Sequence, residues 1–480
     1  MTDPFSLVPL AVASREGTVD EHPAVALVAA GITLLQRSAV LVRALAGRRA
    51  ALLLPTGPQT ITALAATEGR GAVLINPLAS PFEAAYQLRD ADVGAVLTIA
   101  SLAGKLPPGT VHVLLDESPR SAVVVGPDGQ RTVDLGSHVA LDLVGDPDAE
   151  GSDEESAIVY TSAMEGRPLG AILTHRNLLA NARATIAGAK LGPHDRALAA
   201  LPWSHLFGLV VSGITPLLAG ATVRTMSRFN PARALELLES DGITLFVGVP
   251  AMYVSMLAAM QRRGAPLRAP ELRLCICGGA PLRPALQAEW LAATGIDLRQ
   301  GYGLTEASPV VLFNALPAAN PIGALGTPYP GVEVSLRDPR TFTPVADGVP
   351  GEICVRGMTV FRGYVARPGG PEPRGLEVRD GWLRTGDLAT RAPDGNFIFA
   401  GLVKSMFTRN GFNIYPREIE RAVAELPGVR EARVTPIPDL ARENEIALEV
   451  RGAAAEADVR AWCEQRLSAY KQPAVVRTAP

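Results

Sequence analysis

The sequence predicts an α/β fold with a large N-terminal domain rich in parallel sheet and a small α+β C-terminal domain. Three observations support this prediction. At 480 residues the chain is too long for one compact domain. Short apolar runs alternate with helix-like segments over most of its length, as in parallel α/β sheets. The final part shows a different pattern, so we expect domains at 1–401 and 402–480.

The large domain shows this alternation in order along the chain. Strands are predicted where short apolar runs occur, at 51–55, 71–77, 94–99, 243–250 and 272–280. Helices are predicted for the amphipathic or apolar segments at 81–92, 251–264 and 281–295. Strands separated by helices of this length predict a parallel sheet.

The small domain begins with a segment, 413–428, whose pattern is typical of a helix. Pro416 lies near its first turn, and Ile419, Val423 and Leu426 share one face. A strand is predicted at 430–437 and a second helix around 458–470.

Composition excludes several classes of protein. The hydrophobic content of 48% with 19% charged residues is typical of a soluble globular protein. The net charge of -3 gives no sign of a nucleic-acid partner. No apolar stretch approaches the roughly 20 residues needed to span a bilayer, and the N-terminus does not resemble a signal peptide. Cys275 and Cys277 alternate in an apolar run, which favours packing over a disulfide or zinc site. We therefore expect a cytoplasmic protein without a membrane span.

The segment 156–181 has the outline of a phosphate-binding loop, with an apolar strand, small hydroxylated residues, two glycines and an amphipathic helix. Alone, this pattern fits a simple turn equally well. Five further motifs follow it in order along the chain, at 201–208, 277–282, 298–309, 380–389 and 401–420. With the loop, these motifs resemble the adenylate-forming superfamily, which includes acyl-CoA synthetases, peptide-synthetase adenylation domains and luciferases.

This resemblance implies a two-step reaction. ATP and a small carboxylic acid give an acyl-adenylate and pyrophosphate, and a thiol then displaces AMP. The implied cofactors are Mg²⁺, ATP or AMP, and coenzyme A, with a carrier-protein thiol as another possible acceptor. The small domain would rotate about a hinge in the 401–420 motif between the two steps.

The resemblance also assigns roles to residues. Glu306 would hold Mg²⁺, Thr305 would hydrogen-bond the α-phosphate, and His205 would lie beside the acyl group; these three are the candidate catalytic residues. Asp387 would accept hydrogen bonds from the ribose, although an Asp at such a corner also stabilises turns. A histidine such as His205 also often serves only in packing. The nucleotide would contact Thr161, Ser162, Gly166, Gly278, Gly279, Ala280, Gly301, Tyr302, Gly303, Thr305 and Asp387.

Several positions depart from the family pattern. The loop commonly reads YTSGTTGxPKG, whereas this chain has YTSAMEGRPLG. The changed positions are Ala163, Met164, Glu165 and Leu169 in the loop, and Leu402 and Ser405 in the linking motif. Two hydroxyls and two cations are lost and one anion is gained. A catalytic lysine in a Gly-Lys motif is expected about twenty residues beyond Tyr470–Pro473; the sequence ends at Pro480, and Lys471 does not match that lysine by position.

Two hypotheses about function follow. One is an acyl-CoA synthetase-like protein that activates or binds a carboxylic acid, with impaired use of ATP. The other is a non-adenylating enzyme or pseudoenzyme that handles preformed acyl-adenylate or acyl-CoA, or serves as an acyl-binding partner. A nicotinamide oxidoreductase is disfavoured because no strand is followed by the glycine fingerprint. The apolar stretches 202–213 and 311–321 favour an aliphatic or aromatic acid.

Overall fold

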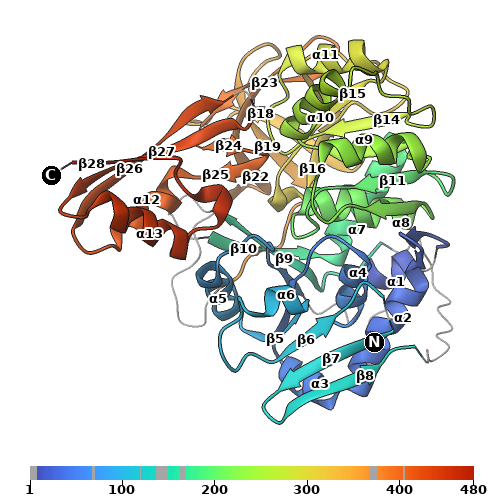
Figure 1. Ribbon diagram of the computed structural model, residues 1–480. Helices are drawn as coiled ribbons and strands as arrows, with labels where there is room; N and C mark the ends of the chain where they lie inside the picture. Colours follow the sequence, from blue (N-terminus) through green and yellow to red (C-terminus); the bar gives the residue numbers. More distant parts are fainter. Residues whose placement is uncertain are drawn as a thin grey trace.

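The computed structural model contains a large α/β unit and a small α+β unit that projects from one side of it (Figure 1). The residues that the structure describes are 8–13, 15–67, 71–118, 120–136, 150–162, 168–366, 376–403, 406–439 and 441–479. Five positions singled out in the sequence lie outside these ranges, namely Ala163, Met164, Glu165, Gly166 and Ser405.

One sheet of the large unit is built mostly from the N-terminal third of the chain. In the described residues its strand order is β20-β10-β9-β4-β3-β5-β6-β7-β8. The central strands β9, β4, β3, β5 and β6 are parallel, and both edges are antiparallel. The strands are β3 (Arg49–Leu53), β4 (Ala72–Leu74), β5 (Val93–Thr98), β6 (His112–Leu115), β7 (Ser121–Gly126), β8 (Gly129–Asp134), β9 (Glu155–Ser162), β10 (Pro168–Thr174) and β20 (Gly363–Tyr364).

The second sheet has a parallel half and an antiparallel half. Its order within the described chain is β18-β19-β22-β23-β17-β16-β15-β14-β13-β11-β12-β1-β2, with β21 beside β22. Strands β15, β14, β13, β11, β12 and β1 are parallel neighbours. The strands are β1 (Thr18–Val19), β2 (His22–Pro23), β11 (Arg196–Ala199), β12 (Thr222–Thr225), β13 (Leu245–Gly248), β14 (Leu274–Cys277), β15 (Leu298–Gly303), β16 (Val310–Phe313), β17 (Ala324–Pro328), β18 (Val332–Arg337), β19 (Gly351–Gly357), β21 (Val378–Arg379), β22 (Trp382–Arg391) and β23 (Phe397–Leu402).

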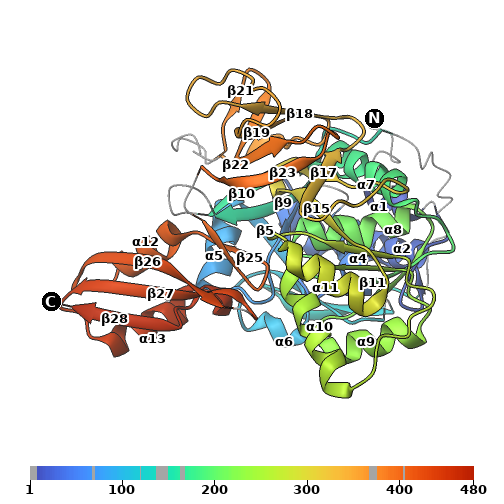
Figure 2. The same cartoon turned by 90° about the horizontal axis from the view of Figure 1, so that it is seen from above.

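Helices lie between the two sheets and over their outer faces (Figure 2). Helix α7 contacts β9 and β10 of the first sheet and β16 of the second. It begins with a capping box between Thr174 and Asn177, which satisfies peptide groups at its N-terminus. The helices of the large unit are α1 (Val8–Ala13), α2 (Ala24–Arg37), α3 (Ala39–Leu45), α4 (Pro58–Ala65), α5 (Pro81–Asp90), α6 (Ala100–Ala103), α7 (His175–Ala189), the π-helix η2 (Phe207–Ile214), α8 (Thr215–Leu218), α9 (Pro231–Ser240), α10 (Pro250–Arg263), α11 (Pro284–Thr294) and the 3₁₀-helix η3 (Thr305–Ala307).

The small unit has a hydrophobic core of its own, which includes Ile419, Val423, Leu448 and Val459. Its antiparallel strands β26 and β27 are joined by β28, which runs parallel to β27. The elements are β24 (Phe407–Arg409), β25 (Phe412–Ile414), α12 (Pro416–Ala424), β26 (Val429–Asp439), β27 (Glu443–Gly452), α13 (Glu456–Arg466), η4 (Ala469–Lys471) and β28 (Val475–Ala479). The division at 401/402 stays a prediction, since β23 of the large unit ends at Leu402.

A buried charge cluster and a hairpin join the two units. Lys471 Nζ lies 2.6 Å from Glu418 Oε1 of the same unit and 3.0 Å from Glu83 Oε1 on α5. Burial alone would lower the pKa of Lys471, but the two carboxylates raise it well above its usual value. At the tip of the β24–β25 hairpin, Gly411 adopts a positive φ of 76° and packs against Val249 of the large unit.

The described helices include no single one that is long and apolar enough to cross a membrane. Only α2 and α3 taken together reach that length and composition, and they meet at an angle of 88°.

The predicted α/β class and the predicted order of elements are confirmed. The strand predictions at 51–55, 71–77, 94–99, 243–250 and 272–280 correspond to β3, β4, β5, β13 and β14. The phosphate-loop segment differs in one respect: a second strand, β10, precedes α7. Its apolar residues pair antiparallel with β9, so the loop is the turn of a hairpin.

The fold depends on a buried carboxylate at the start of β11, which gives a first prediction. Asp195 accepts hydrogen bonds from Arg273 (2.8 and 2.9 Å), Thr244 (2.7 Å) and the Gly192 peptide (2.9 Å), and its side chain is 2% exposed. Burial would raise the pKa of Asp195, but these donors outweigh burial and lower it. We expect Asp195→Ala to reduce the free energy of unfolding by about 2 kcal/mol or more, because it leaves buried donors without an acceptor.

The pH dependence of this stabilisation follows from the direction of the shift in the pKa of Asp195. A lowered native pKa means that the stabilisation is present above the pKa of the unfolded chain and is lost as pH falls through the native pKa. The difference in thermal midpoint between Asp195→Ala and the unmodified protein should therefore shrink in acid. Glu236→Ala, which removes the exposed pair with Arg233, is the control and should shift the midpoint little. Equal shifts for the two variants would contradict the prediction.

Candidate active site

A cavity of about 770 Å³ lies where the two sheets and the small unit meet. Its wall includes β15 and η3 of the second sheet region, β9 of the first sheet, and residues of α12 and η4 from the small unit. The carboxyl ends of parallel strands β14 and β15 open toward it, which is where ligands bind in open α/β sheets.

Glu306 occupies the middle of the short helix η3 and is 5% exposed. Its Oε1 accepts hydrogen bonds from Thr161 Oγ1 (3.0 Å) and from the Tyr364 hydroxyl (2.8 Å). Burial and the neighbouring Glu306 carboxylate raise the pKa of Tyr364, so the tyrosine stays a donor. Both hydrogen bonds end on Oε1 of the carboxylate.

The described residues contain no group of three or more His, Cys, Asp or Glu side chains that could hold a metal ion. Mg²⁺ does not require such a group, because it is usually held by one or two carboxylates together with substrate phosphates. The buried carboxylate of Glu306 fits this role.

Tyr302 and Asp387 form the second polar pair of the cavity. The Tyr302 hydroxyl donates to Asp387 Oδ2 at 2.7 Å, which joins the end of β15 to β22. Burial, and then the charge of Asp387, raise the pKa of Tyr302 well above its usual value. The tyrosine is therefore a neutral donor to the carboxylate of Asp387, which lines the cavity.

Small residues shape the wall between these pairs. A Cβ on Gly303 would lie 1.8 Å from the Pro309 carbonyl oxygen, and one on Gly278 would lie 2.8 Å from the Phe207 ring. Gly279 adopts a φ of 76°, which L side chains rarely adopt. The backbone at the ends of β14 and β15 can therefore come close to a ligand.

His205 lies just before the π-helix η2, a type of helix often found at functional sites. Burial lowers the pKa of His205, so the imidazole is neutral at neutral pH. Ser204 and Phe207 line the cavity on the same segment, together with Gln300 of β15. This end of the cavity thus combines apolar wall with neutral polar groups.

Of the positions that depart from the family pattern, Leu402 lines the cavity, and Leu169 is paired with the cavity-lining residue Thr161. Leu169 is the antiparallel partner of Thr161, and Leu402 is the antiparallel partner of Asp387. Directly opposed residues point to the same face of a sheet, with Cβ atoms roughly 5 Å apart. A cation at either position would therefore lie beside a predicted nucleotide contact.

The basic side chains along the described cavity wall come from α5 and from the small unit. They are Arg89, Arg421, Arg466 and Lys471. Lys471 is already paired with two carboxylates, and Arg466 lies 2.9 Å from Glu425. The part of the wall formed by Thr161, Thr305 and Glu306 carries hydroxyls and a carboxylate.

The cavity brings together most of the residues that the sequence predicts. Those lining it are Thr161, His205, Gly279, Ala280, Gly301, Tyr302, Gly303, Thr305, Glu306, Asp387 and Leu402. Gly278 lies behind the wall against Phe207, and Ser162 ends β9. Their roles in binding stay predictions. The sequence did not identify Tyr364 as a site residue. The only local feature there is a Gly-Tyr pair, which forms the short strand β20.

Comparisons with known proteins agree with this geometry. The family described as "AMP-binding enzyme" matches residues 36–365. The feruloyl-CoA synthase of Amycolatopsis sp is 38% identical over 329 residues, covering 67% of this chain and 65% of that protein, so the match spans less than two thirds of that relative. The long-chain-fatty-acid–CoA ligase of Bacillus subtilis is 29% identical, covering 89% of this chain and 81% of that one.

A solved structure is also similar over nearly the whole chain. It is a malonyl-CoA ligase ternary product complex with methylmalonyl-CoA and AMP bound, 28% identical, with a TM-score of 0.78 and coverage of 98% of this chain and 96% of that one. The large and small units described above match the arrangement of adenylate-forming folds. By its match over residues 36–365 and its acyl-CoA ligase relatives, this chain belongs to the AMP-binding enzyme family.

Proposed function

We propose that the protein is an acid–thiol ligase that holds a small carboxylic acid as its acyl-adenylate and transfers the acyl group to a thiol, with weakened use of ATP. The acceptor is coenzyme A or the thiol of a carrier protein. The proposal rests on a single observation. One cavity is lined by Thr161, Tyr302, Thr305, Glu306 and Asp387, by apolar side chains, and by residues of the small unit.

The proposed chemistry assigns each polar group a task. The acid's carboxylate oxygen attacks the α-phosphorus and pyrophosphate leaves; the thiol, losing its proton, then attacks the acyl carbonyl and AMP leaves. Asp387 would accept hydrogen bonds from the ribose, for which a carboxylate is suited. Thr305 would donate to the α-phosphate. Mg²⁺ bound at Glu306 would offset negative charge on the phosphates.

Weakened use of ATP is inferred from charge. The β- and γ-phosphates need nearby cations, and the two cross-strand positions that could supply them, 169 and 402, carry leucine. Two unit charges about 5 Å apart attract by about 3 kcal/mol at an effective dielectric constant near 20, and solvent reduces this further. Each lost cation would therefore weaken ATP binding by about tenfold. AMP, which lacks the outer phosphates, should be affected less.

We propose that the acid has no charged group other than its carboxylate. His205, Phe207 and Gln300 line the cavity without a positive charge, since burial lowers the pKa of His205 and its imidazole is neutral. An aliphatic or aromatic acyl chain fits this wall, and the names of the feruloyl-CoA and long-chain-fatty-acid relatives are consistent with both classes.

The same charge distribution favours a second candidate, a protein that no longer forms the adenylate and instead handles preformed acyl-adenylate or acyl-CoA. The two half-reactions separate the candidates. Acid-dependent pyrophosphate release measures adenylation, and conversion of a supplied acyl-adenylate to the thioester measures transfer. Transfer without pyrophosphate release would favour the second candidate, and neither activity with any aliphatic or aromatic acid would overturn both as enzymes.

We predict that AMP binds more tightly than ATP, and that Leu169→Lys reverses much of this difference. The lysine adds a cation beside Thr161 and should raise ATP affinity about tenfold while changing AMP affinity little. Titration calorimetry with both nucleotides in Mg²⁺ measures this. Leu169→Met, which keeps the side-chain volume without the charge, is the matched control. If Leu169→Lys and Leu169→Met change the affinity for ATP by the same factor, the electrostatic argument is wrong.

A further prediction concerns the metal. Glu306→Gln keeps an oxygen that can accept from Thr161 and Tyr364 but removes the charge that would hold Mg²⁺. The gain in ATP affinity on adding Mg²⁺ should fall by about tenfold or more in this variant, whereas AMP affinity without Mg²⁺ should change little. Nucleotide titrations with and without Mg²⁺ test the prediction, and an unchanged Mg²⁺ effect would remove Glu306 from the metal site.

A further inference from the structure

Strand β22 carries a bulge at Asp387. Its register with β19 shifts between the pairs Cys354↔Arg384 and Glu352↔Leu388. Between these pairs β19 has one residue, Ile353, whereas β22 has three, Thr385, Gly386 and Asp387. Extra residues in one strand break the ladder locally and re-aim side chains, and such bulges are frequent beside active sites.

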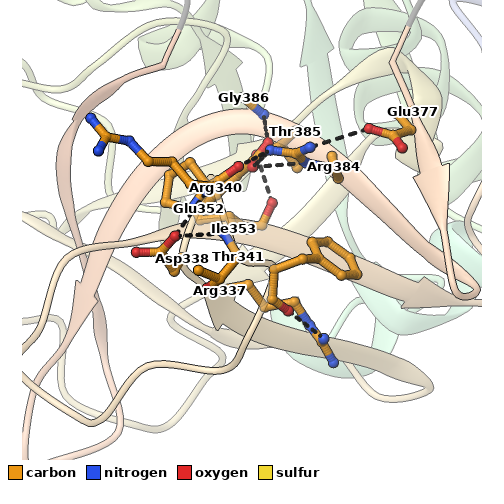
Figure 3. Close-up of polar contacts among 12 residues, drawn as sticks. Arg337, Asp338, Arg340, Thr341, Glu352, Ile353, Glu377, Arg384, Thr385 and Gly386 are labelled. Carbon is orange, nitrogen blue, oxygen red and sulfur yellow. Dashed lines mark hydrogen bonds and ion pairs between the residues drawn. The ribbon is translucent and has the colours of Figure 1, made fainter.

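The peptide groups freed by this bulge are satisfied by side chains (Figure 3). The Gly386 N–H donates to Glu352 Oε1 at 3.0 Å. The Thr385 hydroxyl donates to the Ile353 carbonyl at 2.8 Å (Figure 3). It also accepts from the Asp387 N–H at 3.1 Å. Since buried peptide groups need partners, the bulge has this shape only while Glu352 and Thr385 supply them.

Glu352 is held in place by its own partner. Its side chain is 3% exposed, and its Oε2 accepts from Arg384 Nε at 2.9 Å and Nη2 at 2.6 Å. Arg384 is fixed in turn by the Pro339 carbonyl at 2.9 Å and by Glu377 at 3.2 Å (Figure 3). The buried carboxylate is thus neutralised on one oxygen and directed at Gly386 with the other.

Gly386 also connects the bulge to the chain that leads to the small unit. It adopts a φ of 77°, and its carbonyl accepts from the Val403 N–H at 2.8 Å. Asp387 itself pairs with Leu402 across the ladder. A shift at Gly386 would therefore move Asp387 and the end of β23 together.

We propose that Glu352 is a positioning residue for nucleotide binding, which acts through the Gly386 peptide to aim the Asp387 carboxylate at the ribose hydroxyls. This inference rests on the proposed function, because it needs Asp387 to contact the ribose. Glu352 does not line the cavity, so its effect on a ligand is indirect. Arg384 supports it by neutralising a carboxylate that would otherwise be buried without a partner.

The test compares two ligands that differ only where Asp387 would act. AMP has both ribose hydroxyls and 2′,3′-dideoxy-AMP has neither, so the ratio of their affinities measures the ribose contact. We expect the unmodified protein to prefer AMP by about tenfold, equivalent to about 1.4 kcal/mol. Glu352→Ala should reduce this preference to within about twofold, mainly by weakening AMP, whereas a merely structural defect would weaken both ligands alike.

Further variants make the result specific. Glu352→Gln has one acceptor oxygen, which can serve the Gly386 N–H or Arg384 but not both, so it should restore the preference for AMP only in part. If Glu352→Ala does not fold, Glu352→Asp keeps the charge beside Arg384 but withdraws the acceptor from Gly386, and it should lose the preference in the same way. Glu333→Ala on β18, which breaks the exposed pair with Arg356 of β19, is the control and should leave the ratio unchanged.

The outcomes separate this inference from the proposed function. If the unmodified protein prefers AMP and both Glu352→Ala and Glu352→Asp keep that preference, the positioning role is wrong and the ribose contact of Asp387 stands. If the unmodified protein binds both ligands equally, Asp387 does not contact the ribose. The proposed ribose contact and the positioning role of Glu352 are then both wrong. If Glu352→Ala weakens both ligands by the same factor, Glu352 is only structural and the inference is overturned.

Discussion

The antiparallel pairing of β22 with β19 and β23 is the constraint on which the site and the placement of the small unit both depend. Its pairing with β19 is interrupted so that Asp387 faces the cavity and meets Tyr302. Its pairing with β23 places Leu402 opposite Asp387, at the end of β23 where the boundary between the two units is predicted. One strand thus sets the position of a binding carboxylate and the point of departure of the small unit.

The charges around the cavity are divided between its two sides. Glu306 and Asp387 belong to the large unit and receive hydrogen bonds from Thr161, Tyr364 and Tyr302. The basic lining side chains described above belong to α5 and the small unit. Lys471 and Arg466 are already paired with carboxylates, so part of this positive charge is neutralised within the protein.

The sequence was sufficient for the fold because the signal for parallel sheet is local. Apolar runs such as 51–55 and 94–99 are mostly buried, and helix α5 before the second run is exposed on one face, so these elements could be predicted alone. The second strand of the phosphate loop, β10, was missed because an apolar run of this length before a helix fits either type of element.

The candidate site was predicted less completely, for a different reason. Thr305, Glu306 and Asp387 lie in short motifs that the family resemblance identifies, and the cavity gathers them. Glu352 and Tyr364 act through contacts with residues distant in sequence, such as Gly386 and Glu306, which no local pattern encodes.

At the tip of the β24–β25 hairpin, a Cβ on Gly411 would lie 2.7 Å from Val249 Cγ1. The hairpin can lie this close to Val249 only because residue 411 has no side chain, and alanine there would require the hairpin or Val249 to shift.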